Sequence, residues 1–416
     1  MLKQYFYELY PPLHNLSKRL SIELINQITA IISLPLIVNG LEFETYGFFT
    51  FCLFFSYLMG SISGWGIHVH IIESLASNKI DKDKINNYVS VSIVLKFIGL
   101  ILYILGVLFF SNFVFQTLNI SQQNLFILFI LAFLIIFNPI ELIQAFGKIE
   151  KILLLSIIGR LLFLLLLFIY KDVLNFSLLI YFFIIMMILP FVLGYNLIWD
   201  KINFINFLTV KNFSIIFGIV KKSKNTIFLF LENQYFFIIL AFILSFKFDL
   251  YEIAIFNFLI QLFNPGLKLV EMSMRLAWQT IIKDAKIKKN LLSTFLVLFL
   301  ISFFLLTSIF GFSLFSLIIS NQSLLDVWQE IKLILYILCI EVIYFNIIYV
   351  YLYEKYNQVN QTENIIFPFL WLKIVIIPLI FFLDLNILNI FLLYGLIKVV
   401  QILLILIKVK LSNKAV

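Results

Sequence analysis

Apolar runs of about 20 residues recur along the whole chain, and they constrain its fold more than any other feature. A run of this length, folded as a helix, crosses a hydrocarbon layer of roughly 30 Å. Of the 416 residues, 63% are hydrophobic and 12% are charged, whereas a soluble domain carries roughly 25% charged residues. The sequence therefore predicts an all-α polytopic membrane protein.

Polar breaks between the runs divide the chain into twelve predicted transmembrane helices. These spans are residues 18–39, 48–72, 87–110, 124–147, 152–170, 176–199, 225–246, 250–275, 291–320, 330–353, 364–384 and 386–407. The longest break, residues 200–224, predicts a cytoplasmic or interfacial linker with an amphipathic helix between lobes at 1–199 and 225–416. Similar acidic outer loops precede Tyr46 and Tyr251, which indicates two six-helix lobes arranged as parallel repeats around a central cavity.

The distribution of basic residues predicts the orientation of the spans. With both termini in the cytoplasm, the inner segments hold 22 of the 30 Lys and Arg residues. The outer loops hold three, Lys171, Lys247 and Lys332, and the other five lie within spans. Because short cytoplasmic loops collect Lys and Arg, this bias supports an even number of spans near twelve. The net charge of +8 is then explained by anionic lipid headgroups and gives no reason to expect a nucleic-acid partner.

Several ionisable residues lie deep within the predicted spans, where a charge is costly and usually faces a bundle interior or a wet cavity. They are Glu23, Lys96, Glu141, Arg160, Glu232, Lys268, Glu271, Glu341, Lys373 and Lys398. The basic members predict a cavity that suits an anionic substrate, because a guanidinium matches phosphate oxygens with a fork of donors. Two alternatives stay open: Glu271 could pair with Lys268 one turn away, and Lys398 could reach an interface by snorkelling.

Motifs of soluble enzymes are absent from the sequence. It has no nucleotide-binding glycine loop and no nucleophile elbow, so no catalytic residues are predicted. His68 and His70 stand at alternate positions, a spacing that does not suit a metal pair on a helix. Cys52 and Cys339 lie in apolar runs, as packed free thiols do. We therefore expect no metal and no cofactor, apart from coupling to a proton or another cation.

The stretch NPIELIQAFGKIEK, residues 138–151, interrupts one of the most apolar parts of the chain. With the following ILLLSIIGRLLFLLLLF, it resembles the fourth-to-fifth helix passage of Wzx-type bacterial polysaccharide flippases, a branch of the multidrug/oligosaccharidyl-lipid/polysaccharide exporter superfamily. The matching positions are Pro139, Gln144, Gly147, Lys148, Glu150 and Lys151. The stretch ISLPLIVNGLEFETYGFFTF resembles the family's first loop, and GWGIHVHIIESLASNK resembles the end of its second helix.

The resemblance implies two six-helix lobes around a cavity that opens alternately to either side of the bacterial inner membrane. The implied substrate is an undecaprenyl-pyrophosphate-linked oligosaccharide, such as an O-antigen repeat unit, carried from the inner to the outer leaflet. A polysaccharide polymerase and a chain-length regulator are the implied partners. In this reading the pyrophosphate or sugars bind Arg160, Lys96, Lys268 and Lys373. Proton or cation coupling would use Glu23, Glu141, Glu232 or Glu341.

Two other functions stay open as alternatives. A drug exporter of the related branch would favour a cavity of acidic and aromatic side chains, and the mid-span lysines argue against it. A membrane polysaccharide polymerase or glycosyltransferase would carry a large outer loop for its acceptor, and the predicted outer loops are short.

Overall fold

The fold is described from a computed structural model of the chain. The structure describes residues 25, 27–64, 82–114, 121–145, 149–198, 236–283, 289–318, 327–348, 383 and 385–414. Within these ranges all regular elements are helices and no strand occurs, which confirms the predicted all-α class. Six described helices are long and apolar enough to cross a membrane: Phe43–Gly64, Val89–Asn112, Leu154–Val173, Phe176–Ile198, Leu250–Lys268 and Ile387–Ile407. The chain is therefore a multi-pass membrane protein.

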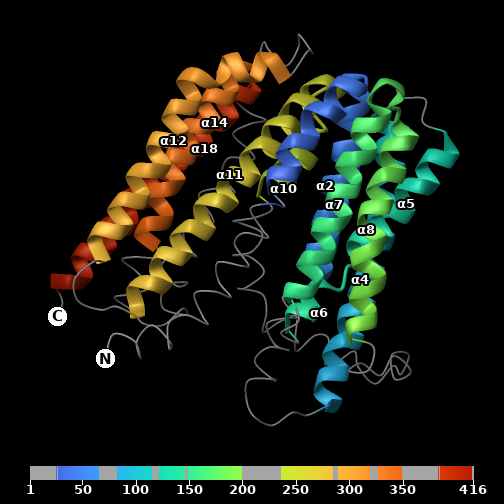
Figure 1. Ribbon diagram of the computed structural model, residues 1–416, viewed down its shortest axis with the longest axis horizontal. Helices are drawn as coiled ribbons and strands as arrows, with labels where there is room; N and C mark the ends of the chain where they lie inside the picture. The colour runs from blue at the N-terminus through green and yellow to red at the C-terminus, as the bar shows by residue number, and fades with distance from the viewer. Residues whose placement is uncertain are drawn as a thin grey trace. The chain divides into compact units, whose positions relative to one another are not determined.

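Contacts divide the chain into two compact units, and one of them is Ile25–Ala254. Its helices, most of which are labelled in Figure 1, are Gln27–Gly40, α2 (Phe43–Gly64), α4 (Lys82–Phe109), η1 (Phe110–Val114), α5 (Gln122–Ile136), α6 (Ile140–Ala145), α7 (Ile149–Tyr170), η2 (Lys171–Val173), α8 (Phe176–Ile198) and α10 (Phe236–Leu244). Within this unit α2 packs on α4 and α5, while α8 packs on α5 and α7.

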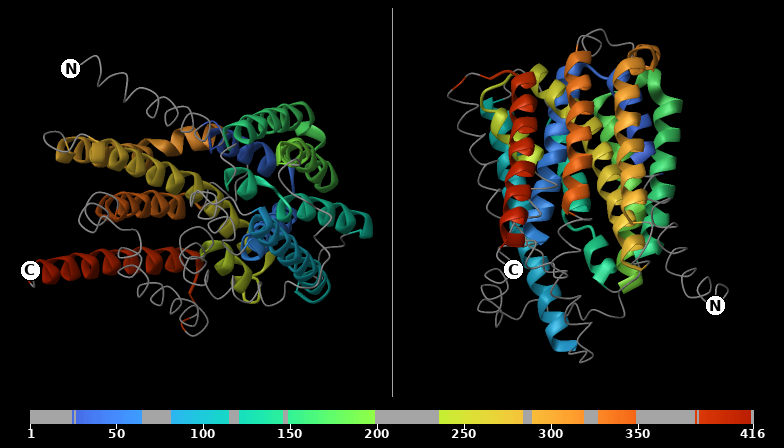
Figure 2. Two further views of the ribbon diagram at one scale, coloured as in Figure 1. Left: turned by 90° about the horizontal axis from the view of Figure 1, so that it is seen from below. Right: turned by 90° about the vertical axis from the view of Figure 1, so that its left-hand side faces the viewer.

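The other unit holds Ile255–Val416. Its described helices are most of α11 (Leu250–Lys283), α12 (Lys289–Ile318), α14 (Trp328–Asn346) and α18 (Ile387–Lys414). In this unit α14 packs against both α12 and α18 (Figure 2). The division falls within α11, later in the chain than the predicted start of the second lobe, and the predicted linker lies outside the described residues. The predicted lobes and the cavity between them therefore stay predictions.

The predicted spans agree with the observed helices wherever both can be compared, with one clear exception. Span 124–147 was expected to be one helix, but α5 ends at Ile136 and α6 begins at Ile140. Proline at position 139 has no backbone N–H and disfavours helical geometry in the residue before it, so the helix breaks here. The side-chain Oδ1 of Asn138 then accepts a 3.0 Å hydrogen bond from the N–H of Ile140 and caps the new start. The predicted span 364–384 lies almost entirely outside the described residues.

Helix α7 shows how the membrane environment divides one helix into two faces. Along its middle, large apolar side chains are exposed on one face every three or four positions: Leu154, Ile158, Leu161, Leu165 and Phe168. Such a face suits lipid and would be unfavourable in water. The opposite face carries Ser156, Gly159 and Arg160, so the polar side chains of this segment turn into the helix bundle.

Two glycines permit the close helix approaches that shape the interior of this unit. A Cβ atom added to Gly159 would lie 2.5 Å from the carbonyl oxygen of Met186, so α7 and α8 can come together here only without a side chain. In α2, a Cβ atom on Gly60 would lie 3.3 Å from the Cα atom of Ile136 at the end of α5. Small residues at such contacts are typical of helix packing in membranes. They let α7 approach α8 and α2 approach α5 closely.

Candidate functional site

A pocket of about 260 Å³ lies inside the unit formed by residues 25–254. It is lined by α2, α4, the junction of α5 with α6, α7 and α8. Its lining residues are Tyr57, Gly60, Ser61, Lys96, Ile135, Ile136, Asn138, Ile140, Ser156, Arg160, Met186, Met187 and Pro190. Apolar walls with a few convergent polar groups are the usual composition of a ligand site.

The break between α5 and α6 supplies the polar centre of this pocket. A broken helix leaves backbone carbonyl groups without their helical partners, and in a membrane these groups must find other donors. The ammonium of Lys96 donates a 3.0 Å hydrogen bond to the carbonyl oxygen of Asn138. The hydroxyl of Tyr195 donates a 2.8 Å hydrogen bond to the carbonyl oxygen of Phe137. The break between α5 and α6 thus gives an otherwise apolar span a hydrogen-bond acceptor for the buried ammonium of Lys96.

The described residues that line the pocket include two cations, Lys96 and Arg160. Lys96 is only 3% exposed, and Arg160 is partly buried on the face of α7 that carries Ser156. Among the described residues that line the pocket, none is acidic. Two cations in a space with apolar walls attract an anion more strongly than they would in water, because the local dielectric constant is low. The guanidinium fork and the ammonium are the donors that a phosphate group prefers.

The structure brings together two of the four predicted substrate-binding residues. Lys96 and Arg160 line the same pocket, whereas Lys268 is an exposed side chain of α11 in the other unit and does not line it. Lys373 lies outside the described residues. The substrate role of all four residues stays a prediction.

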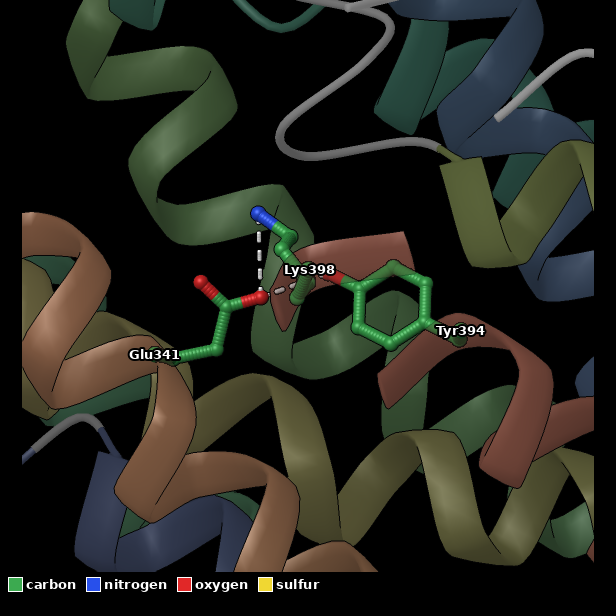
Figure 3. Close-up of polar contacts among 3 residues, drawn as sticks. All are labelled: Glu341, Tyr394 and Lys398. Carbon is green, nitrogen blue, oxygen red and sulfur yellow. Dashed lines mark hydrogen bonds and ion pairs between the residues drawn. The ribbon is translucent and has the colours of Figure 1, made fainter. Parts of the chain in front are cut away.

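The predicted coupling residues are described only in part. Glu23 and Glu232 lie outside the described residues, and Glu141 belongs to α6 but its side chain is not described. Glu341 is fully buried in α14, and its Oε1 lies 3.0 Å from the Nζ of Lys398 in α18 (Figure 3). The alternative that Lys398 snorkels to an interface is wrong, since its side chain is only 2% exposed. The pair lies in the unit that holds residues 255–416.

Several residues of these two sites were missed at the level of sequence. In the pocket they are Tyr57, Ser61, Asn138 and Ser156. Around the ion pair they are Tyr344 and Tyr394. For the ion pair a signal was available, because Tyr394 stands one helical turn before Lys398 and Tyr344 one turn after Glu341. The Ser and Tyr residues of the pocket carried no comparable signal, since such residues are common in apolar helices. Asn138 opens the stretch 138–151 that interrupts the apolar span, but the sequence did not show that it lines a pocket.

Comparisons with known proteins find similarity in structure only. No protein-family model matches the sequence, and no curated protein matches it either. The fold is similar to the inward-facing structure of a multidrug resistance MATE family transporter of the MOP superfamily, with a TM-score of 0.65, 14% identity and coverage of 96% of this chain and 99% of that chain. It is also similar to the lipid II flippase MurJ in an inward closed conformation, with a TM-score of 0.67 and 14% identity. This match covers 94% of this chain and 86% of that chain.

At this level of identity the likeness shows a shared fold. The fold is that of polytopic transporters, and one of the two neighbours belongs to the superfamily indicated by the sequence resemblance. Membership of that superfamily, and of its Wzx-type branch, stays a prediction.

Proposed function

We propose that this protein is a flippase that carries a lipid-linked oligosaccharide across the membrane, and that Lys96 and Arg160 hold the phosphate of the headgroup. The observation that carries the proposal is the meeting of these two cations in one pocket inside a membrane-spanning helix bundle. The fold gives independent support, since one structural neighbour is named as a lipid II flippase.

The physical problem of such a flippase is the charged headgroup. A phosphate that enters a bilayer loses its water, and the cost is large unless protein donors replace that water. The ammonium of Lys96 and the guanidinium of Arg160 can do so, while the lipid tail stays in the surrounding hydrocarbon. At about 260 Å³ the pocket is smaller than the roughly 300–1,000 Å³ of sites for drug-sized ligands. We therefore assign it to the phosphate part of the substrate and leave the sugars outside it.

The finer features of this function are predictions from the sequence. They are an undecaprenyl-pyrophosphate carrier, an O-antigen or similar repeat unit, transfer from the inner to the outer leaflet of the bacterial inner membrane, and cytoplasmic termini. Alternating access between two lobes and coupling to a proton or another cation belong to the same set. The partners, a polysaccharide polymerase and a chain-length regulator, are also predictions from the sequence. A transporter, and not a polymerase, is the proposal because the structural neighbours are transporters.

A drug exporter is the second candidate, and one observation favours it. The chain covers 99% of a multidrug resistance MATE family transporter with a TM-score of 0.65. The charge of the pocket favours the flippase, because Lys96 and Arg160 would repel a cationic drug and attract a phosphate. Export of cationic dyes by cells that overexpress the protein, unchanged by Arg160→Gln, would favour the exporter.

The proposal is tested with purified protein in liposomes that contain a polyprenyl-pyrophosphate-linked oligosaccharide with a fluorescent sugar. A membrane-impermeant quencher measures how fast the label moves between leaflets. We expect Arg160→Gln to slow this movement and Lys171→Gln to leave it unchanged, because Lys171 is an exposed residue after the end of α7. Equal rates for the wild type, Arg160→Gln and the double variant with Lys96→Met would reject the proposed site. No movement in wild-type liposomes, above that in protein-free liposomes, would reject the flippase.

A further inference from the structure

We infer that Glu341, Tyr344 and Tyr394 form a cation-binding cage, and that its occupant is the ammonium group of the chain's own Lys398. The cage lies between α14 and α18, and none of its residues lines the pocket of Lys96 and Arg160. The consequence for transport, drawn below, rests on the proposed function, but the cage itself does not.

The geometry is that of a site for a primary ammonium. The Nζ of Lys398 lies 3.0 Å from Oε1 of Glu341 and 3.9 Å from the centroid of the Tyr344 ring. The ring centroid of Tyr394 is 5.7 Å from the same nitrogen. One carboxylate and aromatic faces within about 6 Å are the groups by which proteins recognise alkylammonium ligands. Figure 3 shows the ammonium and the Tyr394 hydroxyl converging on the same carboxylate of Glu341.

Each helix supplies two members of the arrangement from one face. Glu341 and Tyr344 are three residues apart on α14, and Tyr394 and Lys398 are four residues apart on α18, so each pair shares a side of its helix. The hydroxyl of Tyr394 donates a 2.7 Å hydrogen bond to Oε1 of Glu341. This bond fixes the carboxylate for the ammonium. The packing of α14 on α18 therefore builds the cage and fills it in the same step.

Burial makes an occupant necessary. Glu341 is 0% exposed and Lys398 is 2% exposed, so neither charge can be stabilised by water. The second oxygen of Glu341, Oε2, has no hydrogen-bond partner in the described part of the chain. A carboxylate buried in this position needs a cation beside it. Lys398 supplies the cation from within the chain.

A tethered cation changes what Glu341 can do in transport. A buried carboxylate without a partner would be a site for a proton or a metal cation from solution. With Lys398 in place the site is electrically neutral, and a second cation would add an uncompensated charge to the interior. The cage therefore makes Glu341 independent of cations in the medium. If the chain is a flippase, Glu341 does not couple its transport to a cation gradient.

The test removes the tethered ammonium and supplies a free one. Lys398→Ala deletes three carbon atoms and the nitrogen, the atoms of n-propylammonium. We expect this ion to raise the melting temperature of Lys398→Ala and to leave that of the wild type unchanged. At ten times its dissociation constant it would favour the folded state of Lys398→Ala about elevenfold. Propan-1-ol, which has nearly the same shape without the charge, should have no such effect.

Two matched variants define the control. Lys398→Met fills the cage with an uncharged chain of similar length, so n-propylammonium should not stabilise it. Lys332→Ala removes a lysine of α14 that is not part of the cage, and this variant should not respond to the amine. If Lys398→Ala does not fold alone, the readout is the yield of monodisperse protein from cells grown with and without n-propylammonium, and we expect the amine to restore it.

The outcomes separate this inference from the proposed function. Failure of n-propylammonium to stabilise or restore Lys398→Ala, or an equal effect of propan-1-ol, would overturn the cage. In the liposome assay we expect slow flipping by Lys398→Ala and recovery with the amine. A wild type that does not flip the lipid, combined with stabilisation of Lys398→Ala by the amine, would reject the flippase and keep the cage.

Discussion

The most specific prediction from the pocket concerns the joint action of Lys96 and Arg160. If both side chains hold one phosphate group, replacement of either one by a neutral residue of similar size removes a charged hydrogen bond to the phosphate. Such a bond contributes about 1.5–3 kcal/mol, so Lys96→Met and Arg160→Gln should each weaken binding roughly 10- to 150-fold. Because Lys96 also donates to the carbonyl oxygen of Asn138, its replacement should in addition lower thermal stability.

The losses of binding free energy caused by the two substitutions should not add. When one cation is missing, the phosphate is held less firmly, so removal of the other costs less than it does in the wild type. Residues that share a partner show coupling of about 0.5–3 kcal/mol in double-mutant cycles. Arg160→Lys keeps the charge and loses the fork of donors, so it should weaken binding less than Arg160→Gln.

The assay is titration of detergent-solubilised protein with farnesyl pyrophosphate, and farnesol serves as the uncharged comparison ligand. We expect the wild type to prefer the pyrophosphate, and both single variants to lose that preference. Losses that add to within about 0.5 kcal/mol would mean that the two side chains do not share a ligand. Equal affinity of the wild type for the pyrophosphate and the alcohol would refute the electrostatic reasoning itself.

Three further changes test the architecture around the pocket. Gly159→Ala places a methyl group 2.5 Å from the carbonyl oxygen of Met186, so it should destabilise the protein by about 1–3 kcal/mol in thermal unfolding. Pro139→Ala should let α5 and α6 join into one helix, take the carbonyl of Asn138 away from Lys96, and slow flipping in liposomes. Asn138→Ala removes the side-chain cap of α6 and should lower stability by about 1 kcal/mol. Flipping should persist, because Lys96 bonds to the backbone of this residue. Loss of flipping in this variant would show that the Asn138 side chain has another role.

The sequence predicted the class of fold because the hydrophobic signal is strong and local. Spans such as 152–170 and 176–199 match α7 and α8 closely, since their ends are marked by polar residues. The break inside span 124–147 was missed, although Pro139 was noted, because a proline in a membrane helix produces either a kink or a complete interruption. Which of the two occurs depends on the donors that neighbouring helices offer to the freed carbonyl groups.

The candidate sites were predictable only in their charged members. A lysine or an arginine in the middle of a span signals a polar interior, and this reasoning identified Lys96 and Arg160. Their meeting could not be predicted, because it depends on contacts of α4 and α7 with the same broken helix. The partner of Glu341 was equally hidden, since the pairing with Lys398 follows from which faces α14 and α18 turn toward each other.

The proposed function requires that a phosphate headgroup enters the pocket of Lys96 and Arg160. It is tested most directly by a cysteine at Ser61, which lines the pocket, in a chain whose two native cysteines are replaced. We predict that a water-soluble methanethiosulfonate reagent labels Ser61→Cys, and that farnesyl pyrophosphate slows the labelling while farnesol does not. If Ser61→Cys is not labelled, or is labelled at the same rate with and without the pyrophosphate, the headgroup does not enter this pocket.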